Sequence, residues 1–279
     1  MKTVADIMSR LPIVAEVPGT RSDAINIMVR NGITGVPVVR SSDGKLVGIV
    51  SRKDIFRNFN EDQLSIIMKK DFITVESTAT IPSVAKIFLD RRIHRIPVVE
   101  NGKLVGVITP TDFLDEIREL KTNVTAGEVI TQTCATVYVN DPLSYVVSSM
   151  RVNEIMALPV LDAKGELVGI ITDRDLFIDQ TKDLDALREM GLDETDQMLA
   201  GYRNVLPLFY VATNKNLPEE YTVRDFMVSD PTTVYKKTSL SEVAKIMKQN
   251  NFGQILVHGN KGELVGMIYD IDVLAALLR

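Results

Sequence analysis

The sequence predicts an α/β (α+β) protein built from four copies of one strand–helix–strand–strand–helix unit. Three observations predict this fold. An apolar hairpin recurs four times, an amphipathic helical segment precedes each hairpin, and an acidic helix start follows it. The composition, with 45% hydrophobic and 25% charged residues, is that of an ordinary globular protein.

The hairpin is the most regular part of each copy. Two β-branched runs flank a glycine-bearing turn, which is a strong hairpin signal. Both strands are apolar on successive residues, so we expect each sheet to be covered on both faces. The four hairpins span residues 35–50, 95–108, 157–171 and 254–268.

The segment before each hairpin has helical periodicity and capping residues. In the third copy, Asp141 suits the N-cap, Pro142 the first helical position, and Val146 the apolar face. In the fourth copy, Ser239 and Glu242 form a capping box. A short strand is expected before each helix, at residues 13–14, 73–75, 136–139 and 233–235.

The spacing of the copies predicts the domain organisation. Repeat one occupies residues 1–60, repeat two 61–121, repeat three 122–178 and repeat four 222–279, with an insert at 179–221. Within the insert, residues 183–199 are acidic with a helical pattern, and 206–210 form an apolar patch. The insert is either a linker packed on the core or a lid or partner surface.

Each hairpin ends in the same motif, Gly-h-h-Ser/Thr-x-x-Asp, in which h is apolar. It occupies residues 48–54, 106–112, 169–175 and 266–272, and only the last copy departs, with Tyr269 in place of Ser or Thr. With this motif the unit resembles the CBS (cystathionine-β-synthase) domain over nearly the whole chain. The resemblance implies two Bateman modules, repeat one paired with two and three with four. The layout is similar to the γ subunit of AMP-activated protein kinase and to archaeal stand-alone CBS proteins.

The motif has a structural and a functional interpretation. Ser/Thr-x-x-Asp is a capping box, so Ser51, Thr109 and Thr172 could simply begin helices. A carboxylate can also accept hydrogen bonds from both ribose hydroxyls. The resemblance implies that the motif aspartates bind ribose in clefts between paired repeats. These aspartates are Asp54, Asp112, Asp175 and Asp272, the last made doubtful by Tyr269.

A basic pair, His94 and Arg95, occurs only in repeat two. It either caps the end of a helix, where cations are favourable, or clamps a phosphate. The resemblance favours a phosphate clamp, and we expect His94 and Arg95 to form one site with Thr109 and Asp112. The adenine wall of that site is then expected near Ile13 and Val14 of repeat one.

Two further sites follow from the same resemblance. One would combine Ser51 and Asp54 with Ile73 and Thr74 as its base-lining residues. The other would combine Thr172 and Asp175 with Thr232 and Thr233. Met156 stands there at the position of His94, so this pocket would suit a less anionic ligand.

Taken together, these motifs predict a sensor and not an enzyme. Sequence signatures of serine hydrolases, P-loop proteins and zinc peptidases are absent, and no cofactor is expected. The expected ligand is AMP, ADP or ATP, and the alternative is S-adenosylmethionine or methylthioadenosine. A second alternative is a ligand-free scaffold in which the motifs only cap helices.

Net charge and hydropathy limit which partners and which cellular location we expect. A net charge of −5 makes nucleic acid an unlikely partner. Cys134 is the single cysteine, and the sequence lacks both a signal-peptide pattern and an apolar run long enough to cross a bilayer. We therefore expect a cytoplasmic protein without membrane contact. Apolar positions at the C-terminus, including Leu274 and Leu278, suggest a homodimer that acts on a regulated protein.

Overall fold

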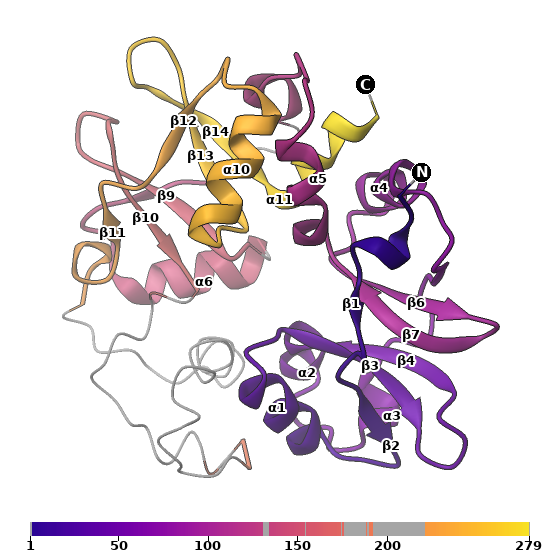
Figure 1. Cartoon of the computed structure of the whole chain (residues 1–279). Helices are drawn as coiled ribbons and strands as arrows, with labels where there is room; N and C mark the ends of the chain where they lie inside the picture. The colour runs from indigo at the N-terminus through magenta and orange to yellow at the C-terminus, as the bar shows by residue number, and fades with distance from the viewer. Residues whose placement is uncertain are drawn as a thin grey trace.

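A computed structural model describes residues 2–130, 134–153, 155–173, 175, 188, 190–191 and 221–278. Within these ranges the chain forms four small sheets, each with helices, and the predicted four-copy α/β fold is confirmed. Repeats one and two, indigo to magenta, lie together in Figure 1, and repeats three and four, rose to yellow, lie together opposite them. The predicted helix at 183–199 and the patch at 206–210 fall outside the described residues, apart from Arg188, Met190 and Gly191.

Repeats one and two have the same order of elements after a short N-terminal lead. The lead consists of the 3-10 helix η1 (Val4–Asp6) and β1 (Ser9–Arg10). Repeat one contains β2 (Ala15–Val17), α1 (Arg21–Arg30), β3 (Gly35–Arg40), β4 (Leu46–Ser51), α2 (Arg52–Arg57) and α3 (Leu64–Ile67). Repeat two contains β5 (Val75–Glu76), α4 (Ile81–Arg91), β6 (Ile96–Glu100), β7 (Lys103–Ile108), η2 (Pro110–Phe113) and α5 (Leu114–Arg118).

Repeats three and four follow the same plan. Repeat three contains η3 (Ala126–Val129), β8 (Val137–Tyr138), α6 (Leu143–Asn153), β9 (Ala157–Leu161) and β10 (Leu167–Thr172). Repeat four contains η6 (Val223–Asp225), β11 (Val228–Ser229), β12 (Thr233–Tyr235), α10 (Leu240–Asn250), β13 (Gln254–His258), β14 (Leu264–Tyr269), α11 (Asp270–Val273) and η7 (Leu274–Leu277).

The leading strands differ in part from their predicted positions. The strand predicted at 13–14 lies instead at Ala15–Val17, where it pairs in parallel with β3. Ile13 is 41% exposed, whereas Ala15 is fully buried, so burial begins two residues later than the apolar run suggests. In repeat two the strand covers only Val75–Glu76, while the strand at 233–235 is as predicted.

Each module is joined by an exchange of lead segments. The lead strand β1 pairs antiparallel with β7 of repeat two, and β11 of repeat four pairs with β10 of repeat three. In return, Lys69, ahead of repeat two, bridges to Ile49 of repeat one. These pairings join repeat one to two and repeat three to four.

The motif glycines make this exchange possible. A Cβ placed on Gly48, Gly106 or Gly169 would lie only 2.6, 2.5 or 2.8 Å from the sulfur of a methionine in the incoming segment. Any larger residue would therefore displace that segment. The methionines are Met68, Met8 and Met227, and in repeat four Ile130 takes the corresponding place above Gly266.

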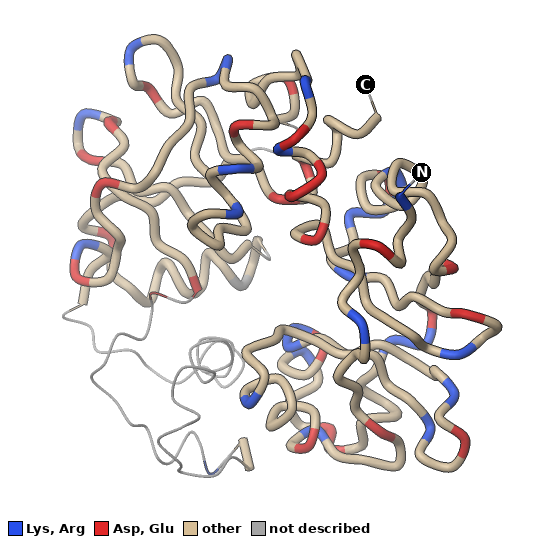
Figure 2. Tube along the Cα trace, in the orientation of Figure 1, with Lys and Arg blue, Asp and Glu red and all other residues tan. Residues whose placement is uncertain are grey.

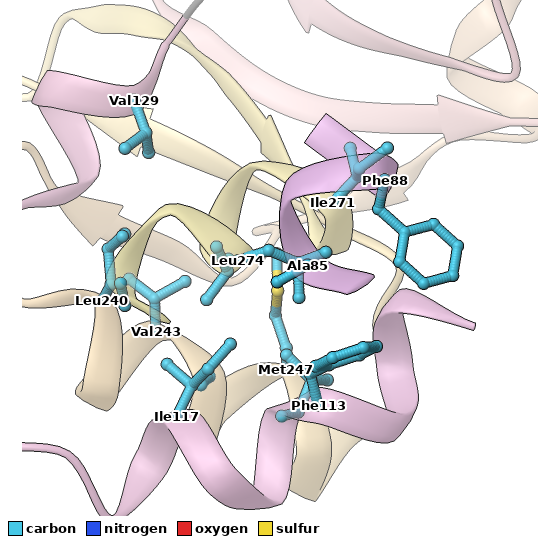
Figure 3. Close-up of a cluster of buried hydrophobic side chains, with 14 of the residues drawn as sticks. Ala85, Phe88, Phe113, Ile117, Val129, Leu240, Val243, Met247, Ile271 and Leu274 are labelled. Atoms are coloured by element: carbon cyan, nitrogen blue, oxygen red, sulfur yellow. The ribbon is translucent and has the colours of Figure 1, made fainter. Parts of the chain in front are cut away.

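The two modules meet unequally. Buried side chains of repeats two and four form one continuous cluster in which α4 and α5 contact α10 and η7 (Figure 3). Phe113 and Met247, from opposite modules, both belong to it. Repeats one and three instead have separate clusters.

The described surface mixes both charge signs. Lys and Arg alternate with Asp and Glu along all four repeats in Figure 2. None of the described helices combines the length and apolar character that a bilayer crossing requires.

Candidate functional site

All four motif aspartates hydrogen-bond back to the residue three positions earlier, which is the N-cap of a helix in the first, second and fourth copies. One oxygen, Oδ2, accepts a hydrogen bond from the backbone N–H three residues earlier, at 2.7–2.9 Å. In the first three copies the Ser or Thr hydroxyl also donates to this oxygen, at 2.5–2.8 Å. Oδ2 is therefore used by the capping hydrogen bonds. Whether the motif can also bind a ligand depends on the other carboxylate oxygen, Oδ1.

The second carboxylate oxygen divides the four copies into two classes. Oδ1 of Asp54 is paired with Lys69 Nζ at 3.1 Å, and Oδ1 of Asp272 with Arg92 Nη1 at 2.5 Å. For Asp112 and Asp175, Oδ1 makes no hydrogen bond or ion pair with the rest of the described chain. These two aspartates keep an acceptor for a ligand.

A cavity of about 380 Å³ opens at Asp175, in the cleft between repeats three and four. Thr172 and Thr232, which were predicted to lie in one site with Asp175, both line it, whereas Thr233 does not. Ile170 and Leu256 contribute apolar wall. The strands β10 and β13, together with the segment between β11 and β12, carry the lining residues Thr172, Ile170, Leu256 and Thr232.

The charges at this cavity are mainly negative. Among the described lining residues, Asp173, Asp175 and Asp230 face one guanidinium, that of Arg52. Arg52 Nη2 lies 2.7 Å from Asp173 Oδ2, so the charge of this guanidinium is balanced by that carboxylate.

The basic pair of repeat two lies toward repeat one. Arg95 donates from Nη2 to Thr34 Oγ1 at 2.9 Å, and its guanidinium fills the space that the missing side chain of Gly35 leaves. Burial, followed by the charge of Arg52, lowers the pKa of Arg95 to about 10. These surroundings place Arg95 beside the Asp54 copy, while its grouping with Asp112 stays a prediction.

His94 belongs to the same cationic region. Its side chain still reaches the surface. Partial loss of solvent lowers the pKa of His94, and the neighbouring charges of Lys53, Arg92 and Arg95 lower it further. A neutral imidazole beside several cations is suited to an anionic partner that would restore its proton.

The other expected site residues differ in their burial. Burial raises the pKa of Asp112, whose Thr109 partner begins η2. Of the predicted base-lining residues, Ile13 and Thr74 are exposed and Val14 and Ile73 are half-buried. Ile73 packs against the core that repeats two and four share.

The fourth copy is closed by Tyr269 and by Arg92 of repeat two. Arg92 holds the free oxygen of Asp272, as described above, and Tyr269 packs against two hydrophobic clusters. Burial raises the pKa of Tyr269 to about 12, so the phenol stays protonated. Both observations agree with the doubt that the sequence raised over this copy.

Several residues at the cleft were not singled out as binding residues from the sequence. Arg52 and Asp173 each directly follow the cap residue of a motif, and that position was their only signal. Lys69 and Arg92 lie outside the motif and had none. Among the described residues, no group of His, Cys, Asp and Glu could hold a metal ion.

Fold and cleft together define a regulatory protein made of paired, ligand-binding repeats. A sequence model of the CBS domain matches residues 4–61, 64–119, 126–178 and 223–279. The chain therefore belongs to the CBS domain family. Such domains are generally non-catalytic regulatory units, and some enzymes carry them as accessories.

Full-length structural neighbours share the arrangement of all four repeats. MJ1225 of Methanocaldococcus jannaschii is 28% identical over 193 residues, 62% of this chain and 68% of that protein. Its crystal structure, of a proposed archaeal homologue of γ-AMPK, aligns over 99% of this chain and 100% of its own with a TM-score of 0.71 at 24% identity. A Pyrococcus horikoshii protein of uncharacterised function aligns over the same shares with a TM-score of 0.70 at 25% identity.

Other curated relatives are longer proteins. Inosine-5′-monophosphate dehydrogenase of Thermoplasma acidophilum is 28% identical over 245 residues, and the match covers 87% of this chain but 46% of the enzyme. An A-adding tRNA nucleotidyltransferase of Aquifex aeolicus matches over only 14% of its length. These alignments concern the repeat region that the chains share.

Proposed function

We propose that this protein is a sensor that binds an adenosine-containing ligand in clefts between paired repeats, with the Asp175 cavity as its main site. The supporting observation is the cavity of about 380 Å³ beside a motif carboxylate whose Oδ1 has no protein partner in the described chain. Small-molecule pockets usually measure about 300–1,000 Å³.

Each wall of the cavity would have a distinct task. Oδ2 of Asp175 is fixed by Thr172, which leaves Oδ1 directed by the helix cap to accept a ribose hydroxyl. Ile170 and Leu256 offer apolar contact to a purine. Thr232 adds a hydroxyl that can donate or accept at the base edge.

Ligand identity would differ between the modules. The guanidinium of Arg95 and the imidazole of His94, which an anion would help to protonate, support AMP, ADP or ATP as ligands of the first module, near Asp112 and Thr109. The carboxylates of the Asp175 cavity support S-adenosylmethionine or methylthioadenosine as the ligand of the second module. A homodimer, a regulated partner protein and a cytoplasmic location remain predictions.

A melting screen with AMP, ADP, ATP, S-adenosylmethionine and methylthioadenosine tests the proposal. At a ligand concentration 100 times its Kd, binding to the folded state adds about 2.7 kcal/mol and raises Tm. We expect Asp175→Asn to remove the shift produced by the ligand of the second module. Asn keeps an acceptor for the cap, so the folded protein should persist.

Asp272→Asn is the matched control. It makes the same chemical change in the copy that Arg92 and Tyr269 close, and the ligand-induced shift should stay as in the unaltered protein. A shift that survives Asp175→Asn would place the ligand elsewhere. If none of the five compounds raises Tm, the scaffold interpretation replaces the sensor.

A further inference from the structure

The Asp175 cavity in module two is partly built by module one. Arg52, the first residue of α2 in repeat one, lines this cavity between repeats three and four. Met156 of repeat three also lines it, and the same side chain packs against the hydrophobic cluster of repeat one. A ligand here would therefore lie against two side chains that join the modules.

The ion pair at this wall is nearly closed to water. The side chain of Arg52 is 11% exposed and that of Asp173 is 8% exposed, with 2.7 Å between Nη2 and Oδ2. A pair so buried depends strongly on geometry, because the cost of desolvating both charges offsets most of their attraction. Small movements of either partner would change its energy.

Both partners are tied to the backbone beside them. The N–H of Arg52 donates to the carbonyl of Thr34 at 3.0 Å, just before β3, and the N–H of Asp173 donates to the carbonyl of Met156 at 2.9 Å. Displacement of the pair would consequently reach α2 and β3 on one side and β9 on the other. The contact is a physical connection between the cavity and repeat one.

We infer that Arg52 is a positioning residue through which repeat one senses occupancy of the Asp175 cavity. This inference rests on the proposed function of that cavity. A ligand whose polar end meets the Arg52–Asp173 pair favours the arrangement in which the modules are docked there, and so stabilises α2. By reciprocity, anything that undocks repeat one weakens ligand binding by the same factor.

Hydrogen exchange of the full chain, with and without saturating S-adenosylmethionine or AMP, tests this inference. We expect ligand to slow exchange at Thr172 and Gly253, beside the cavity, and at the amides of α2 by at least about fivefold. In the double variant Arg52→Gln/Asp173→Asn, the cavity amides should still be protected and those of α2 should not. The double change avoids leaving one buried charge alone.

Arg57→Gln provides the matched control on the same helix, because Arg57 is exposed at its last turn. It should keep the protection of α2. Protection of the cavity without protection of α2 in the unaltered protein would overturn the inference and leave the proposed function standing. Protection of α2 that persists in the double variant would also overturn it, and absence of protection at the cavity with both ligands would overturn both.

Discussion

The modules meet at two faces, a two–four face between repeats two and four and a one–three face between repeats one and three. These two faces are built differently. Repeats two and four share one hydrophobic cluster, in which α5 packs along α10 and α4 along η7. Among the described residues, repeats one and three meet through the buried Arg52–Asp173 pair and Met156. Met190, which follows repeat three, adds a buried side chain to the cluster of repeat one, and its carbonyl accepts a hydrogen bond from Ser22 at 3.1 Å.

We expect the hydrophobic two–four face to provide most of the stability, and the polar one–three face to respond to ligand binding. Hydrophobic burial is non-directional and large, so the two–four face should hold the modules together. A buried ion pair adds little net stability but is sensitive to position. At the Asp175 cavity the one–three face supplies a charged contact, Arg52, whereas the two–four cluster supplies the apolar side chains of Phe252 and Ile255. At the motif positions of Arg52 and Asp173, repeats two and four carry Pro110 and Asp270, which cannot form such a pair.

Phe113→Ala should have the largest effect on stability. Phe113 is fully buried and forms an edge-to-face contact with Phe88 at 5.7 Å between ring centroids. Removal of its ring should cost about 3–5 kcal/mol of unfolding free energy. Chemical denaturation measures this change.

Met156→Ala is the comparison on the other face. Met156 is half-buried, so we expect it to cost about 1 kcal/mol, clearly less than Phe113→Ala. Equal losses for the two variants would show that the one–three face contributes as much stability as the two–four face, and the contrast between them would fail.

Arg52→Met should have the next largest effect. It removes the guanidinium that faces the buried carboxylate of Asp173 and should destabilise the fold by about 3 kcal/mol. Arg52→Met/Asp173→Leu replaces the whole pair with apolar groups and should recover most of that loss. Urea denaturation of both variants gives the two values.

The outcome of this pair of variants sharpens the contrast between the faces. A double variant as unstable as the single one would mean that the pair is a main source of stability at the one–three face. Full recovery of stability together with loss of the ligand-dependent protection of α2 would instead separate response from stability.

The repeat fold could be predicted because its signals are local and redundant. A hairpin turn, an N-cap such as Ser239 and a motif glycine such as Gly48 recur in fixed order, and each reports on nearby residues. The lead strands were placed less well. Their pairing depends on distant partners, as the shift from Ile13 to Ala15 shows.

The candidate site could be predicted only in part. Thr172 and Asp175, which the motif itself places, line one cavity together with Thr232, which the family resemblance predicted. The sequence could not show that Lys69 and Arg92 would occupy Asp54 and Asp272, since those ion pairs join residues far apart in the chain. The contribution of Arg52 from the other module depends on how the modules pack, which no local pattern encodes.

Asp270→Asn should have the smallest effect, and it tests the two–four face through pH. Burial, and then the nearby Asp272, raises the pKa of Asp270 to about 6, while Arg92 opposes the shift. The folded state therefore binds a proton more tightly than the unfolded state, and stability should fall as pH rises from about 4 to 6. We expect the free energy of unfolding to fall by an amount on the order of 1–2 kcal/mol over this window in the unaltered protein, and by less in Asp270→Asn.

Asp112, whose pKa is also raised, contributes equally to both proteins and cancels in the comparison. Denaturation midpoints at pH 4.5 and 6.5 (roughly the ends of the window) measure the difference. Parallel pH profiles for the two proteins would mean that Asp270 stays ionised beside Arg92, and that the two–four face tolerates a buried charge as well as the one–three face does.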